Sequence, residues 1–264
     1  MELKKVVYSV VDGIGVIEMN TPENLNAVDE QMAEELLCAI DTAEQDSAVK
    51  VVVLKGAGRA FSAGGDVGYF YDCVKSGEHI NHDDLIIKLG NVVDRLKSLS
   101  KLVITSVHGA AAGAGISLSL CGDYMICADN AKLIMAFINL ALVPDTGAAW
   151  LLNRSIGNAR TFELAASGRP MRADEAKELG LAHIVCPKEQ LDEVTMDFAR
   201  KLAKGPLLAY KYLKKQLYDI NYAGYKDFLM ATELPTQQVC NNSDDFKEAC
   251  TAFVEKRPPV FHGK

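Results

Sequence analysis

The stretch VVVL at residues 51–54, followed by the loop RAFSAGGD at residues 59–66, forms a pattern that this chain uses twice. The second copy is LVITSV at residues 102–107, followed by HGAAAGAG at residues 108–115. Each apolar run is rich in β-branched residues, which is typical of a buried parallel strand. Each loop consists of small residues that let the backbone approach a ligand closely. Both copies therefore predict a buried strand, a glycine-rich loop and a helix, in that order.

The paired loops have more than one physical interpretation. Helix N-termini leave backbone N–H groups unpaired and carry positive partial charge, so two such ends facing each other could bind a developing oxyanion. Phosphate binding is less favoured, because no Walker lysine follows either loop and no GxGxxG stretch is present. Gly113 and Gly115 could instead only allow a helix to pack closely on a strand. The residues alone leave oxyanion binding and close packing open.

The rest of the chain predicts an α/β core followed by helices. Asp12-Gly13 lies between two alternating runs and predicts a hairpin, and Asp29 is a candidate N-cap for a helix that ends near Gln45. Strand and helix patterns alternate over the first two-thirds, and helical patterns follow. We expect a catalytic core over residues 1–200 and a helical segment over residues 201–264. Residues 71–82 are polar and are expected to be mobile.

Composition excludes several classes of protein. Of 264 residues, 49% are hydrophobic and 24% are charged, as in ordinary globular proteins. The net charge, 28 − 35 = −7, makes nucleic acid an unexpected partner. The N-terminal residues lack the apolar core of a signal peptide, and no apolar stretch is long enough to span a bilayer. Neither secretion nor a membrane is therefore expected.

The number and spacing of cysteines and histidines indicate whether the chain binds a metal and in which cellular compartment it functions. The seven cysteines are irregularly spaced without a CxxC pair, which indicates reduced thiols in the cytoplasm rather than disulfides or a zinc site. His79 and His82 have a spacing that could bind a metal, but their polar surroundings favour a surface loop. We therefore expect no metal.

Four segments together resemble the crotonase (enoyl-CoA hydratase/isomerase) family. They are LNA at residues 25–27, the loop at residues 59–66, the region at residues 107–122 and FVEKR at residues 253–257. Their order and spacing agree along essentially the whole chain. The resemblance implies an α/β fold, a spiral of ββα units with a helical C-terminal trimerisation region. It also implies an acyl-CoA thioester substrate, no separate cofactor, and a homotrimer or dimer of trimers.

The resemblance assigns roles to matching positions. The backbone N–H groups of Gly65 and Ala114 would form an oxyanion hole for the thioester carbonyl. The residues expected to contact CoA are Asn26, Ala27, Arg59, Ala63, Asp66, Phe253 and Lys256. Local positive charge for the anionic CoA is expected at Lys55, Arg59 and Lys256. The residues expected to line the acyl pocket are Tyr69, Phe70, Phe137 and Leu142. Asp66 could instead hold its own loop, and Phe253, Tyr69 and Phe70 could instead pack structurally.

The acids decide the expected reaction. Family hydratases use two glutamates, and the matching positions here are Ser117 and Phe137, so the chain departs from that pattern twice. Asp145, in LVPDTGAAW at residues 142–150, matches an acid of crotonase-type isomerases, most closely the ring-opening isomerase type of phenylacetate degradation. We expect Asp145 to shift a double bond, from 3-enoyl-CoA to 2-enoyl-CoA, or to isomerise an epoxide or oxepin ring of an aromatic CoA thioester. Apolar neighbours would raise its pKa and make it a better base.

Other interpretations stay open. Asp145 precedes a predicted helix over residues 146–152 and could simply be its N-cap. The chain could be a 2-enoyl-CoA hydratase or catalyse another crotonase reaction. It could also be a non-catalytic binding module, although intact glycine loops and Asp145 argue against this.

Overall fold

The runs on either side of Asp12-Gly13 form the expected hairpin. In this computed structural model, which describes residues 3–77 and 82–264, β1 (Val6–Val11) pairs antiparallel with β2 (Ile14–Met19). Asp12 and Gly13 have φ values of 55° and 77°, as a two-residue hairpin turn of type I′ requires. The prediction of a hairpin is confirmed.

The main sheet has six strands. The four strands after the hairpin are β3 (Val51–Gly56), β4 (Leu102–Val107), β6 (Tyr124–Ala128) and β9 (Ile184–Cys186). The order is β1-β2-β3-β4-β6-β9, and every pairing after the first is parallel. Every residue of β4 is buried. The β-branched runs are therefore explained by burial on both faces of the sheet.

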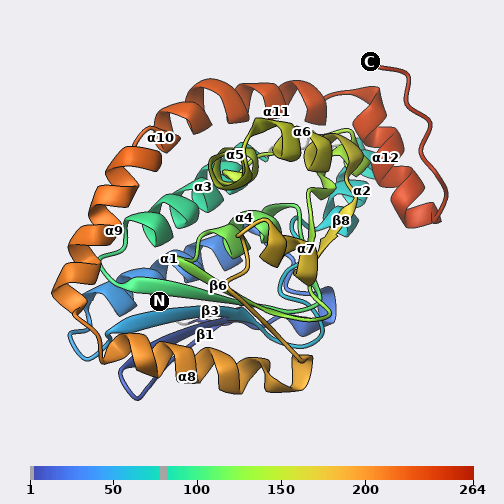
Figure 1. Cartoon of the computed structure of the whole chain (residues 1–264). Coiled ribbons are helices and arrows are strands. Elements are labelled where there is room, and N and C mark those ends of the chain that lie inside the picture. The colour runs from blue at the N-terminus through green and yellow to red at the C-terminus, as the bar shows by residue number, and fades with distance from the viewer. Residues whose placement is uncertain (1–2, 78–81) are drawn as a thin grey trace.

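Helices cover both faces of this sheet (Figure 1). Helices α1 (Glu30–Gln45) and α3 (Asp83–Ser98) lie on one face, and α8 (Leu191–Ala203) lies on the other. Alternate residues of β3 pack on opposite faces of the sheet, because successive strand side chains point to opposite faces. Val52 and Leu54 pack in the cluster that contains α1 and α3, whereas Val51 and Val53 pack with α8. As expected, Asp29 caps α1, with its carboxylate accepting from the Met32 N–H at 2.9 Å.

A second, three-stranded sheet brings the two glycine-rich loops together. Its strands are β5 (Ala110–Ala112), β7 (Lys132–Ile134) and β8 (Pro170–Arg172), in the order β5-β7-β8. The first loop pairs with β5: the Ser62 N–H donates to the Ala110 carbonyl, and the Ala112 N–H donates to the Ser62 carbonyl, both at 3.0 Å. The loops that resemble each other in sequence therefore run side by side.

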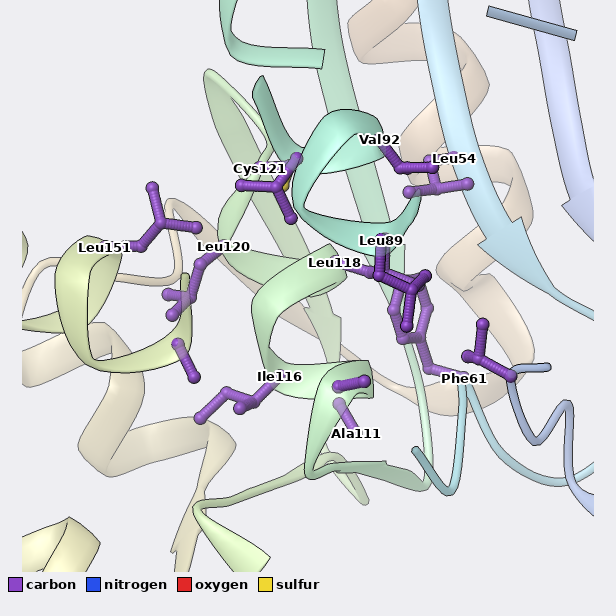
Figure 2. Packing of buried hydrophobic residues seen from close by; sticks show 14 of the residues in the cluster. Leu54, Phe61, Leu89, Val92, Ala111, Ile116, Leu118, Leu120, Cys121 and Leu151 are labelled. Atoms are coloured by element: carbon purple, nitrogen blue, oxygen red, sulfur yellow. The ribbon is translucent and has the colours of Figure 1, made fainter. Parts of the chain in front are cut away.

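The short helix α4 (Ala114–Leu120) follows β5 and is buried along its whole length. Figure 2 shows Leu118 on the side of Leu89 and Val92 of α3, and Leu120 on the side of Leu151. Leu151 belongs to α5 (Ala148–Ile156), which packs against α4. The second glycine loop is therefore fixed by a helix that apolar neighbours enclose.

The last part of the chain is helical, as predicted. Its elements are α9 (Leu207–Asn221), α10 (Tyr225–Phe228), the π-helical turn η4 (Leu229–Glu233), α11 (Leu234–Asn241) and α12 (Asp244–Glu255). In Figure 1 these elements form an outer arc that passes α3 and ends beside α2 (Val67–Ser76). The remaining helices are α6 (Asn158–Ser167), α7 (Ala173–Glu178), η1 (Pro22–Asn24), η2 (Ala136–Leu140) and η3 (Lys188–Gln190). The division of the chain at residue 200 stays a prediction.

The expectation that His82 lies in a surface loop is wrong, whereas the mobility expected of residues 71–82 stays a prediction. Residues 71–76 complete α2, and His82 is buried, with 5% of its surface exposed, rather than lying in a surface loop. The reason is aromatic packing, because the rings of His82 and Phe70 lie 4.2 Å apart and Phe246 of α12 packs against both. His79 lies outside the described residues.

No helix within residues 3–77 and 82–264 has both the length and the apolar character needed to cross a membrane. The same ranges bring together no group of three or more His, Cys, Asp or Glu side chains suited to a metal ion.

Candidate active site

A cavity of about 410 Å³ lies between the two glycine-rich loops and the C-terminal helices. Most of its wall is apolar, and the only acids among its described lining residues are Asp66 and Asp145. The expected site residues that line it are Ala27, Ala63, Gly65, Asp66, Phe70, Ala114, Phe137, Leu142, Asp145 and Phe253. A mostly apolar cavity with few convergent polar groups is the usual form of a small-molecule site.

Gly65 and Ala114, the two expected oxyanion donors, both line this cavity. Among the hydrogen bonds of the described residues, none uses the N–H of either residue, and both residues line the cavity. A Cβ placed on Gly64 would lie 3.1 Å from the Ala114 nitrogen, so the two loops are in direct contact there. Two adjacent free N–H groups can stabilise a negative oxygen. The geometry favours the oxyanion interpretation over packing alone.

Asn26 and Ser62 hold the first loop in place. The Asn26 side chain is fully buried and donates to the carbonyls of Ala57 and Ala60, both at 2.9 Å. The Ser62 hydroxyl donates to the Asn26 carbonyl at 2.8 Å and accepts from the Gly64 N–H at 3.2 Å. Asn26 is not among the residues that line the cavity. Its side chain positions the loop from behind and does not contact the cavity.

Asp145 places one carboxylate at the cavity wall. It is 8% exposed, and its Oδ2 accepts a hydrogen bond from the Gln237 Nε2 at 2.8 Å. Burial raises the pKa of this carboxyl, and the hydrogen bond from Gln237 lowers it. Burial is the larger effect, and the pKa is about 6. Helix α5 begins at Ala148 with Gly147 as its N-cap, and no side chain caps it. The alternative in which Asp145 caps this helix is therefore wrong.

The positions of the two hydratase glutamates lie close to this acid. Ser117 is fully buried, and its hydroxyl lies 2.9 Å from the Thr146 hydroxyl. Phe137 is 6% exposed and forms part of the cavity wall. Neither side chain can carry a proton between carbon and solvent at neutral pH. Asp145 is therefore the one buried carboxylate among the described lining residues.

Glu233 and Gln237 were missed by the sequence interpretation. Gln237 is 1% exposed, and besides binding Asp145 it accepts from the Val143 N–H at 3.1 Å through Oε1. Glu233 is 2% exposed and accepts from the Gly147 N–H at 3.1 and 3.2 Å. Their spacing of four puts them on one helix face, but Glu and Gln on a helix usually face solvent. Only the tertiary structure reveals that this face meets Asp145.

Several expected contacts lie away from the cavity wall. Tyr69 is 56% exposed, and Arg59 and Lys256 are also exposed; none of the three lines the cavity. Lys55 is paired with Asp192 at 2.6 Å and with Glu18 at 3.7 Å, so its charge is already partly neutralised. Asp66 caps α2 by accepting from the Gly68 N–H at 2.9 Å, as the loop-holding alternative expects. Phe253 is 62% exposed yet reaches the cavity mouth.

Comparison with known proteins places this geometry in context. A model of the enoyl-CoA hydratase/isomerase family matches residues 10–264. The chain is 33% identical over 270 residues to trans-2-decenoyl-[acyl-carrier-protein] isomerase of Streptococcus mutans, covering 100% of both chains. It is 34% identical over 267 residues to 1,2-epoxyphenylacetyl-CoA isomerase of Escherichia coli, covering 98% of both. A crystal structure of an enoyl-CoA hydratase from Mycobacterium avium subsp. paratuberculosis superposes with a TM-score of 0.89 at 28% identity, covering 99% of this chain and 100% of that one.

Proposed function

Because the chain belongs to the enoyl-CoA hydratase/isomerase family, we propose that it is an isomerase that converts a 3-enoyl-CoA into a 2-enoyl-CoA. The observation that carries this proposal is that Asp145 is the one buried carboxylate among the described residues that line the cavity, while Ser117 and Phe137 stand at the positions of the hydratase glutamates. Hydration needs a second group to place water and move its proton, whereas a double-bond shift needs one base. Isomerisation of a ring in an aromatic CoA thioester uses the same groups and belongs to the same proposal.

The proton transfer follows from the positions of three groups. Ionised Asp145 removes a proton from the carbon between the thioester and the double bond. The electron pair of that C–H bond moves into the conjugated system, and the negative charge collects on the thioester oxygen. The N–H groups of Gly65 and Ala114 stabilise that oxygen. Asp145 then returns the proton to the far end of the dienolate, and the double bond is now conjugated with the thioester.

The environment of Asp145 suits this role. A pKa of about 6 leaves the carboxylate mostly ionised at pH 7 and makes it a stronger base than an exposed aspartate. The proposed step uses only this carboxylate and two backbone donors, so coenzyme A enters as part of the substrate and no separate cofactor is proposed. All seven cysteines are free thiols, which supports the proposal of a cytoplasmic enzyme.

Product analysis tests the reaction. With aliphatic 3-enoyl-CoA, mass spectrometry and NMR should show conversion to 2-enoyl-CoA, and with 2-enoyl-CoA they should show little 3-hydroxyacyl-CoA. A second panel uses ring-epoxide CoA esters, and a third carries the 3-enoyl groups on acyl carrier protein instead of CoA. Comparing the rates of the three panels identifies the preferred thioester. Robust hydration of 2-enoyl-CoA with no double-bond shift would assign hydratase chemistry instead, and no turnover of any ester would favour a binding module.

Assembly is the second part of the proposal, and we infer a homotrimer or a dimer of trimers. Helix α9 presents an unusually apolar surface for an isolated chain. Its exposed apolar residues are Leu208, Tyr212, Leu213, Leu217 and Ile220. Light scattering should give three or six times the mass of the chain, and Leu213→Glu should shift it towards smaller species. A monomeric wild-type protein would contradict the proposal.

A further inference from the structure

We propose that Glu233 is a positioning residue for Asp145 that carries its own proton at neutral pH, so that Asp145 is the one charged member of a buried pair of acids. The proposal rests on the proposed function, because it concerns how the proposed base, Asp145, is held and kept ionised. Glu233 lies in the π-helical turn η4, and single π-helical turns often occur at functional sites.

Glu233 contacts the backbone at Gly147, two residues after Asp145. Both carboxyl oxygens of Glu233 lie within hydrogen-bond distance of the Gly147 N–H, and the Tyr225 hydroxyl lies 3.3 Å from Oε2. Gly147 has φ of +82°, and a Cβ there would lie 3.1 Å from the Tyr225 ring. The glycine therefore lets the backbone of this segment reach a carboxyl group that is 2% exposed.

Gln237 holds the other end of the segment at residues 143–147. It follows Glu233 by about one helical turn, accepts from the Val143 N–H and donates to the Asp145 carboxylate. Between these two contacts Thr146 has φ of +50°, which is unfavourable for a β-branched residue. Such a conformation persists only where the surroundings hold it. Glu233 and Gln237 together therefore fix both the backbone and the carboxylate of Asp145.

The titratable groups that face Glu233 are Asp145, from the segment before α5, and Tyr225, from α10. Glu233 forms no ion pair with a Lys, Arg or His of the described residues. Burial, and then the negative charge of Asp145, raise the pKa of Glu233 to about 8, whereas the pKa of Asp145 is about 6. Glu233 is held at Gly147, two residues from Asp145, and a second negative charge buried there is disfavoured at pH 7, so the proton resides on Glu233.

This arrangement matters for the reaction. The Tyr225 hydroxyl and the Gly147 N–H both donate to Glu233, and a protonated Glu233 keeps a carbonyl oxygen that can accept from them. The buried pair of acids then holds one negative charge, which moves from Asp145 to the thioester oxygen during the reaction. An ionised Glu233 would add a second negative charge beside the forming dienolate and disfavour it. We therefore expect kcat/KM to rise as pH increases through about 6 and to fall again above about 8.

Three variants test the proposal. Glu233→Gln preserves the shape and the neutral state, so at pH 7 it should keep kcat within about threefold of wild type and should lose the alkaline fall. Glu233→Ala leaves the Gly147 N–H unpaired and should lower kcat by about tenfold or more, with KM little changed. The control is Gln238→Leu, in the adjoining helix α11. It removes a side chain that donates to Asp83 and not to Asp145, so both the acid and the alkaline limb of its pH profile should match wild type. An alkaline fall that persists in Glu233→Gln overturns the proposal.

A spectroscopic measurement locates the proton without using activity. At pH 7 the infrared carbonyl band of a protonated carboxylic acid should be present in wild type, weaker in Asp145→Asn because the charge of Asp145 no longer raises the pKa of Glu233, and absent in Glu233→Gln. Loss of the band in Asp145→Asn but not in Glu233→Gln would place the proton on Asp145 and overturn the proposal. If wild type does not isomerise any ester, the proposed function fails, and the band still decides where the proton resides.

Discussion

Asp145→Asn is expected to lower kcat for 3-enoyl-CoA isomerisation by about 10²–10⁴-fold, the usual contribution of a placed base. The dissociation constant of a saturated acyl-CoA should change little. Asparagine has the shape of aspartate and its carbonyl can still accept from Gln237, but it cannot take up the proton. Steady-state rates and isothermal titration calorimetry give the two quantities.

The matched control for this variant is Asp94→Asn. Asp94 is buried to a similar extent, with 9% exposed, but it binds the Tyr218 hydroxyl at 2.6 Å and does not line the cavity. Its substitution can lower the free energy of unfolding and should leave the isomerisation rate unchanged. An undiminished rate in Asp145→Asn would exclude Asp145 as the base.

Gly64→Ala should lower kcat by about 10²–10³-fold, the loss typical of a disrupted oxyanion hole. Gly64 has φ of +85°, and an added Cβ would lie 2.5 Å from the Ala112 carbonyl oxygen and 3.1 Å from the Ala114 nitrogen. The backbone must move to relieve this contact, and Gly65 and Ala114 move with it. Because the donors are backbone groups, displacing the loop is the practical way to remove them.

Gly157→Ala is the control for Gly64→Ala. It introduces backbone strain at positive φ without displacing the glycine-rich loop. Gly157 has a similar φ of +79°, but an added Cβ there would meet nothing within 4 Å. Both variants pay the conformational penalty of alanine at positive φ, and thermal unfolding compares their stability. Equal kcat in the two variants, measured where both are folded, would argue against the oxyanion role of this loop.

Local signals account for what the sequence predicted correctly. The runs at residues 51–54 and 102–107 are β-branched because they are buried on both faces, and the glycines after them allow the loops to touch. The family match and the superposition at a TM-score of 0.89 confirm the predicted crotonase fold. Features that depend on neighbouring residues in the chain were therefore predictable.

Features that depend on distant residues were not. Residues 71–76 look polar, but they belong to a helix whose Phe70 packs on Phe246, far along the chain. The acid at residue 145 has the local pattern of a helix cap, and its true partner, Gln237, lies 92 residues later. Neither contact leaves a periodic signal in the sequence. In both cases the decisive partner comes from the C-terminal helices.

The distance from Asp145 to Gln237 also has a consequence for the newly made protein. A ribosome synthesises the sheet, both glycine loops and Asp145 well before it reaches η4 and α11. A nascent chain of that length has both glycine-rich loops but lacks Gln237, which binds the Asp145 carboxylate, and Phe253, which lines the cavity. The site is therefore complete only after the last helices have been synthesised and packed. Chains truncated before residue 233 should be inactive even where their sheet has formed.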